Sequence, residues 1–238
     1  MSNFTVSLDL GQSVDSSAAL LVERVHVIVP EDESHFERQV PDGAYWYAER
    51  LIYDTWHVRH IRRWPLGTDY TVIVADVGDM FSEPELRHQA VLVMDYSGVG
   101  RGVHDMFIES YRAGRLGDRW PVRVTLSGGF ATDASSQGVS SHKGDVVSKL
   151  LAAAQRGRVT IVPELPLAGA LESEIRNFIL KQNKRTGGLR FEAKGSSHDD
   201  MLLALAMAVW HKHNHGEPRF VNERGELEQK PWAIATPH

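Results

Sequence analysis

The 238-residue sequence contains no cysteine, which excludes disulfide bonds, thiolate zinc sites and cysteine nucleophiles. No apolar run reaches the roughly 18 residues that a membrane-spanning helix needs, and the N-terminus lacks the basic and then apolar pattern of a signal peptide. The sequence also lacks the G-x-x-x-x-G-K-[ST] loop of P-loop ATPases and the G-x-S-x-G elbow of serine hydrolases. We therefore expect a soluble, intracellular protein whose chemistry uses other groups.

The rest of the composition is that of a globular domain. Hydrophobic residues make up 42% of the chain and charged residues 24%, which suits one sizeable core and argues against wholesale disorder. The net charge of −5 argues against a protein that coats DNA generically, although a carboxylate site is itself negative until a cation binds. Positive charge gathers at 57–63 and 181–185, and each run is typical either of a solvated surface or of contact with phosphate.

The hydrophobic pattern predicts an initial run of strands followed by strands that alternate with helices. Strands are expected over 4–10, 18–29, 45–64, 90–95, 121–126, 159–162 and 189–193, although residues 48–51 fit a helix as well as a strand. Helices are expected over 68–81, 103–111, 143–156, 167–179 and 199–211, with a further short helix after a capping box at 82–85. This order predicts the α/β class, with a mixed central sheet flanked by helices over 1–215 and a polar tail over 216–238.

Acidic residues stand at the ends of three of these elements. Asp9 and Asp95 each end an apolar run, and Asp199 with Asp200 opens an Ala/Leu-rich helix. A carboxylate inside a buried strand carries a large desolvation cost, whereas at a strand end it can reach a cation. If the strands lie side by side and the helix crosses them, these carboxylates form a divalent-metal site. Each also has a purely structural interpretation, as a turn residue or as a partner of the helix dipole.

The glycine-rich segment 97–102 follows a strand and opens a helix, as a dinucleotide-binding loop does. Its third glycine has the wrong spacing, and an acidic residue directly precedes the loop. We therefore interpret it as a turn that lets Asp95 point out of the sheet. The alternating histidines at 211–215 are typical of a solvated tail, with adventitious metal chelation as the alternative.

Five pieces, taken in order, resemble the nuclease domain of phage terminase large subunits. They are VSLDLGQS at 6–13, VMDYSGVG at 93–100, HKGDVV at 142–147, GRVTIVP at 157–163 and HDDMLLALA at 198–206. The resemblance implies an RNase H-like fold and a metal centre of Asp9, Asp95 and Asp200, with Asp199 adjacent and Lys143 nearby. Such domains often carry another carboxylate one turn after His-Asp-Asp, where this chain has Leu203. The choice between Asp199 and Asp200 therefore stays open.

The resemblance also implies an activity. It is that of a two-metal-ion endodeoxyribonuclease, with Mg²⁺ or Mn²⁺, that cuts concatemeric double-stranded viral DNA during genome packaging. Besides DNA, the implied partners are a small terminase subunit, a portal protein and an N-terminal ATPase domain absent from this chain, in the cytoplasm of the infected host cell. No membrane partner is expected. The residues predicted to contact DNA are Arg101, Lys143, Lys184 and Arg185.

Two other interpretations share these residues. A Holliday-junction resolvase or transposase-type nuclease would have the same fold and carboxylates. A non-catalytic DNA-associated module would use the acidic residues only as caps.

The Gly/Ser-rich span 127–142 is expected to be a long loop that leads to Lys143. Long loops in compact domains are usually functional or disordered. We hypothesise that this loop gates DNA entry and that Lys143 stabilises phosphate charge near the metals. A flexible surface loop with a solvated lysine is the alternative.

Overall fold

The computed structural model describes residues 3–11, 15–29, 44–47, 50–127, 133–135, 138–179, 199–211 and 220–221. The strands are β1 Phe4–Asp9, β2 Ser17–Ile28, β3 Tyr45–Tyr47, β4 Arg50–Trp64, β5 Ala90–Asp95, β6 Val122–Ser127, β7 Asp133–Ser135, β8 Gly138–His142, β9 Val159–Ile161 and β10 Phe220–Val221. The helices are α1 Tyr70–Met80, α2 Pro84–Gln89, α3 Gly100–Arg112, α4 Lys143–Gln155, α5 Ala168–Ile179 and α6 Asp200–Trp210. None of these helices has the length and apolar character needed to cross a bilayer.

The described strands form one mixed sheet in the order β3-β4-β2-β1-β5-β6-β8-β7, with β9 paired to β4 and β10 to β2. β1, β2 and β4 are antiparallel neighbours, whereas β1, β5, β6 and β8 are parallel to one another. β1 and β5 therefore end at the same edge of the sheet. Their short apolar sequences place them in the centre, where both faces are covered.

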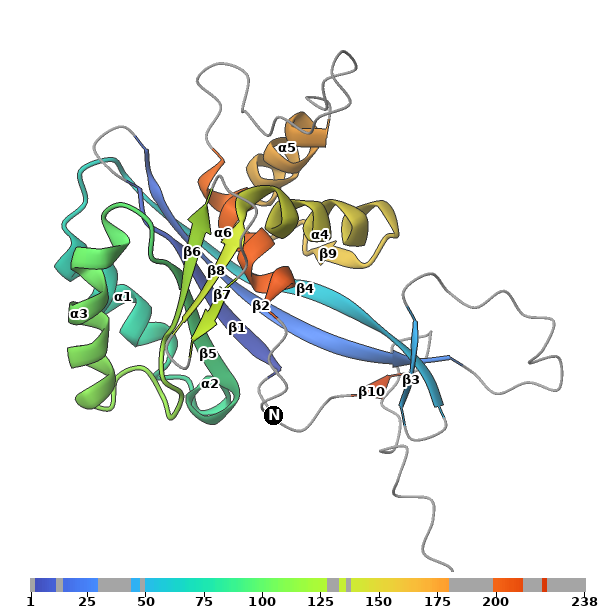
Figure 1. Ribbon diagram of the computed structural model, residues 1–238, viewed down its shortest axis with the longest axis horizontal. Helices are drawn as coiled ribbons and strands as arrows, with labels where there is room; N and C mark the ends of the chain where they lie inside the picture. The colour runs from blue at the N-terminus through green and yellow to red at the C-terminus, as the bar shows by residue number, and fades with distance from the viewer. Residues whose placement is uncertain are drawn as a thin grey trace, which may run out of the picture.

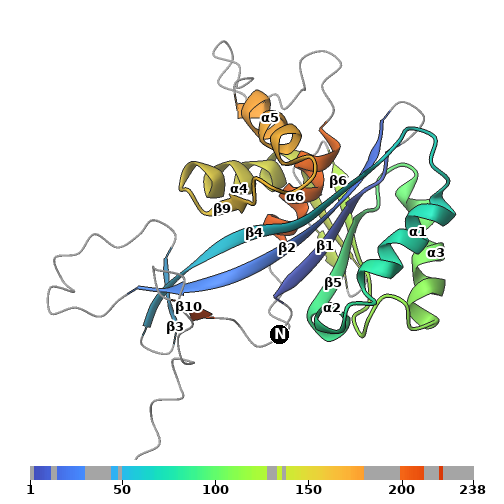
Figure 2. The same ribbon diagram turned by 180° about the vertical axis from the view of Figure 1, so that it is seen from behind.

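Helices cover both faces of this sheet (Figures 1 and 2). α4, α5 and α6 lie on one face, whose core includes Leu20, Val93 and Leu150. α1 and α3 lie on the other face, over a second core that includes Leu8, Leu92 and Phe107. This arrangement confirms the predicted α/β class, a mixed central sheet flanked by helices.

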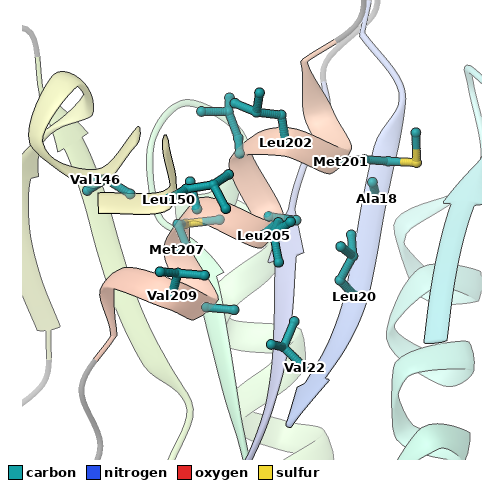
Figure 3. Packing of buried hydrophobic residues seen from close by; sticks show 14 of the residues in the cluster. Ala18, Leu20, Val22, Val146, Leu150, Met201, Leu202, Leu205, Met207 and Val209 are labelled. Atoms are coloured by element: carbon teal, nitrogen blue, oxygen red, sulfur yellow. The ribbon is translucent and has the colours of Figure 1, made fainter. Parts of the chain in front are cut away.

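α6 is the most deeply buried helix of the described part of the chain. All ten residues from Asp200 to Val209 are buried, and the helix packs against α4, β1 and β2. Figure 3 shows its leucine, methionine and valine side chains between those of α4 and those of β2. Because α6 is apolar on every side, it cannot turn toward solvent, and its N-terminus is fixed above the sheet.

β2 and β4 continue beyond the rest of the sheet as a two-stranded ribbon, with β3 and β10 at its far end (Figures 1 and 2). Nearer the centre of the sheet, where β2 also pairs with β1, the β2–β4 pairing shifts by one residue, because Leu21 pairs with His60 whereas Val22 pairs with Val58. Arg59 is therefore the extra residue of a β-bulge. Its guanidinium donates two hydrogen bonds to Glu23, of 2.8 and 2.6 Å.

Two local predictions are wrong. The span 127–142 is not one long loop, because β8 pairs with β6 and β7 pairs with β8. These short, small and polar strands have no apolar alternation, so pairing alone places them. The proposed capping box also fails, because the residue that caps α2 is Glu83, without a side-chain hydrogen bond, and the Ser82 hydroxyl donates instead to the Asp79 carbonyl.

The strand expected over 45–64 is two antiparallel strands, β3 and β4, and α3 begins three residues before the expected helix. The remaining predicted strands and helices that the structure describes are present within about two residues of their expected bounds. The predicted strand at 189–193 lies outside the described residues. Within the predicted tail, the structure describes only Phe220–Val221, which pairs with His26 and Val27 of β2.

Candidate metal centre

The register of the sheet brings Asp9 and Asp95 together. Leu8 pairs with Met94 in the parallel β1–β5 ladder, so the two aspartates are the next residues along neighbouring strands. Side chains alternate between the faces of a strand. Leu8 and Met94 pack in the core beneath α1 and α3, so Asp9 and Asp95 point to the opposite face, where α6 lies.

Among the carboxyls of this group, Asp9 has the pKa that is raised by the largest number of neighbouring charges. It is only 8% exposed, and burial is the largest of the effects that raise its pKa well above the usual value. The charges of Asp95, Asp199 and Asp200 raise the pKa further, in that order, and the charge of Lys143 lowers it. Asp9 therefore sits where a negative charge is costly unless a cation is added.

Asp95 is held by the turn that follows it. The Ser97 backbone N–H donates to Asp95 Oδ1 over 2.8 Å, and α3 begins at Gly100. A Cβ at Gly100 would lie 2.0 Å from the Asp95 carbonyl oxygen, so only glycine allows the chain to fold back this closely. Burial raises the pKa of Asp95, against the lowering effects of the Ser97 hydrogen bonds and of Lys143.

Asp199 and Lys143 meet from two helices. Lys143 is the first residue of α4, and its Nζ lies 3.1 Å from Oδ2 of Asp199, directly before α6. About a third of each side chain is exposed. Because the charge of Lys143 also acts on Asp9 and Asp95, this lysine belongs to the carboxylate group, where the sequence places it.

Asp200 has a different set of partners. Arg63 of β4 donates to both of its carboxylate oxygens, each over 2.7 Å, and a nitrogen of the same guanidinium also contacts Glu174 of α5. Glu174 in turn accepts a hydrogen bond from the Leu202 backbone N–H over 3.0 Å. Burial raises the pKa of Glu174 to about 7, assisted by Asp200 and opposed by the Leu202 and Arg63 contacts.

Sequence reasoning missed Arg63 and Glu174. Arg63 belongs to the basic run 57–63, in which Arg59 pairs with Glu23 and Arg62 pairs with Asp76. The arginines of this run are therefore engaged by carboxylates of the protein itself.

Of the other residues predicted to contact DNA, the structure describes Arg101. Arg101 is exposed in the first turn of α3. Lys184, Arg185 and His198 lie outside the described residues.

Carboxylate oxygens are the ligands that Mg²⁺ and Mn²⁺ prefer, so the chemistry of this group fits such ions. Within the described ranges, however, no group of three or more His, Asp or Glu side chains is already arranged to hold a metal ion. Asp199 and Asp200 are paired instead with Lys143 and Arg63. Completing a metal centre therefore requires at least one of these ion pairs to open.

No family model and no curated protein matches the sequence. Among solved structures, the large terminase nuclease from thermophilic phage G20c is similar, with 17% identity over 88% of this chain and 82% of that chain, at a TM-score of 0.48. The Mn-soaked human cytomegalovirus terminase nuclease domain is 13% identical over 89% and 85% of the two chains, also at 0.48. The inhibitor-bound form of that domain gives 12% identity, coverage of 87% and 83%, and a TM-score of 0.46. Similarity this distant leaves the activity to be argued from the site.

Proposed function

We propose that this chain is a metal-dependent endonuclease that hydrolyses double-stranded DNA. The observation that carries the proposal is the convergence of Asp9 and Asp95 with the start of α6, at one edge of the sheet and on one face. Three other carboxylates act on Asp9, and Lys143 opposes them. A divalent cation would offset this excess of negative charge around Asp9. Divalent cations bound by carboxylates commonly serve phosphodiester hydrolysis.

Each residue has a distinct task in this proposal. Asp9, whose pKa the charges of the three other aspartates raise, would hold the metal ions together with Asp95 and an aspartate at the start of α6. Bound Mg²⁺ or Mn²⁺ would supply an activated water and would offset charge on the leaving 3′ oxygen. Lys143 Nζ would leave Asp199 and hold a phosphate oxygen of the DNA.

The terminase resemblance adds the biological context. In that context the substrate is concatemeric viral DNA, cut during packaging in the cytoplasm of the infected cell. The partners would be a small terminase subunit, a portal protein and an ATPase domain. Arg101 and Lys143, together with Lys184 and Arg185, would contact the DNA backbone.

Cleavage of supercoiled plasmid DNA tests the activity. We expect nicked and linear products with Mn²⁺ or Mg²⁺, none with chelator, and loss of cleavage in Asp95→Ala. Glu109→Gln, at an exposed position of α3, is the charge-matched control and should cleave normally. Equal cleavage by Asp95→Ala and the wild type would refute the proposal. A strong preference for branched over linear DNA would indicate a junction resolvase instead.

A further inference from the structure

We propose that the two adjacent aspartates at the start of α6 have separate tasks. Asp200 anchors the helix through a buried ionic cluster with Arg63 and Glu174, and Asp199 is the carboxylate that turns to the metal. This inference rests on the proposed function, because it assigns a ligand to the same metal centre. It makes Arg63 and Glu174 positioning residues, which act on the site through α6.

The capping of α6 is the first observation. An aspartate at the N-cap position normally accepts a hydrogen bond from the backbone N–H two or three residues later. Asp199 occupies the N-cap of α6, yet its side chain makes no such bond. The Leu202 N–H donates instead to Glu174 Oε2 of α5, over 3.0 Å. Because Glu174 caps the helix from outside, the carboxylate of Asp199 is released for another contact.

The second observation is that both carboxylate oxygens of Asp200 already have hydrogen-bond partners. Both of its oxygens accept hydrogen bonds from Arg63, in the two-pronged geometry that makes arginine–carboxylate pairs strong. The Asp200 and Glu174 side chains are 4% and 9% exposed, so water does not screen the pair. To reach Asp200, a metal ion would have to displace a guanidinium that is 21% exposed and held by two carboxylates, whereas to reach Asp199 it would displace a lysine that is 36% exposed.

The third observation is the position of Arg63 and of Lys143 relative to Asp9. Arg63 pairs with Ala18 of β2, and Ala18 pairs with Asp9, so Arg63 lies two strands away from Asp9. Its guanidinium therefore ties Asp200 to β4, a strand on the side of β1 away from β5. The charge of Lys143, the partner of Asp199, acts on both Asp9 and Asp95. The charges of both aspartates act on Asp9, but only Asp199 is bonded to the lysine that acts on the group, whereas Asp200 is bonded through Arg63 to Glu174 of α5.

Thermal melting with and without Mn²⁺ separates the two tasks. Asp199→Asn should melt within a few degrees of the wild type without metal and should lose the rise that Mn²⁺ produces in the wild type. Asp200→Asn should melt roughly 10 °C lower without metal, because Arg63 loses one of its two carboxylate partners, and should keep a rise with Mn²⁺. Glu109→Gln should behave as the wild type in both conditions.

The reverse pattern, with the Mn²⁺ response lost in Asp200→Asn and kept in Asp199→Asn, overturns the assignment and leaves the nuclease proposal standing. If the wild type gains no stability from Mn²⁺ and cleaves no DNA, the proposed function itself fails. These two failures are therefore distinguishable.

Arg63 and Glu174 supply a second test if Asp200→Asn does not fold. In Arg63→Met and Glu174→Gln, the Mn²⁺ concentration for half-maximal cleavage should rise by at least about tenfold, as for other residues that orient metal ligands. Arg63→Lys keeps the charge and should recover part of that loss. Unchanged Mn²⁺ dependence in Arg63→Met and Glu174→Gln, with lower stability, would reduce the cluster to a merely structural role and overturn the inference.

Discussion

Two buried aspartates of the same sheet, Asp9 and Asp54, have almost equal exposure and opposite electrostatics. Their exposed fractions are 8% and 7%. Asp54 contacts Arg24 at 2.6 Å and His26 at 2.7 Å. Burial raises the pKa of Asp54, but the hydrogen bond from His26 and the contacts with Arg24 outweigh burial and lower it to about 2. For Asp9, burial and the neighbouring carboxylates all act in the raising direction.

β2 accounts for much of this difference, because it pairs with both strands that carry these aspartates. Opposite Asp54 it presents His26, whereas opposite Asp9 it presents Ala18. Cross-strand neighbours are the nearest partners that a sheet offers a side chain. Asp54 is therefore stabilised as an anion by the protein alone, and Asp9 is left to be stabilised by something the protein binds. Burial by itself does not tell a structural carboxylate from a functional one.

The largest expected effect comes from neutralising Asp9, whose negative charge the protein does not balance by itself. Asp9→Asn should lower DNA cleavage by more than about 100-fold, the upper range for residues that only orient metal ligands. Its stability without metal should be unchanged or higher, because burial and like charges both disfavour the native anion. Plasmid cleavage and chemical denaturation in chelator measure the two properties. A clear loss of metal-free stability would mean that Asp9, like Asp54, has a structural task.

Neutralising Asp54, whose charge is balanced by Arg24 and His26, should lower stability and leave cleavage unchanged. Asp54→Asn should lower the free energy of unfolding by about 2 kcal/mol at neutral pH, since a fall in pKa from 3.8 to about 2 corresponds to that amount. A depressed pKa contributes stability that is present above pH 3.8 and is lost as the pH falls through 2. The difference between wild type and variant, measured by urea denaturation, should therefore shrink between these two pH values. Cleavage per folded molecule should be unchanged.

The smallest expected effect concerns Ser7, which precedes Asp9 by two residues and shares its face of β1. Ser7 is fully buried, and its hydroxyl has no hydrogen-bond partner among the described residues. Ser7→Ala removes that unpaired hydroxyl and should change stability by no more than about 1 kcal/mol, in the stabilising direction. Denaturation midpoints measure it. Marked destabilisation would mean that this side of β1 also contains a needed polar contact.

The parts of the fold that the sequence predicts well are those with a strong local signal. β1 and β5 are apolar runs that end in an aspartate, and α6 is apolar throughout, so each is recognisable alone. The meeting of Asp9 and Asp95 follows from those elements once the strands are paired. β7 and β8 carry no such signal, because their positions come from backbone pairing with β6 and with each other.

Arg63 and Glu174 could not be found in the same way. Their partner Asp200 is 137 residues from Arg63, and Glu174 is 111 residues from Arg63. Nothing local to either residue indicates an ion pair across such separations. The basic run 57–63 is the local signal, and it is typical either of a solvated surface or of phosphate contact, whereas Arg63 bonds with carboxylates of the protein.

The bulge at Arg59 adds one residue to β4 and so changes which of the following residues face each side of the sheet. Val58 faces α6 before the bulge, and Ile61 and Arg63 face α6 after it, while Trp64 turns to the core beneath α1. In an uninterrupted strand, side chains at odd and even positions keep their faces, and Arg63 would point away from Asp200. If Arg59 paired in a regular ladder instead, the rest of β4 would exchange faces, and the Arg63 guanidinium would enter the core beneath α1 while the Trp64 indole turned toward the carboxylates.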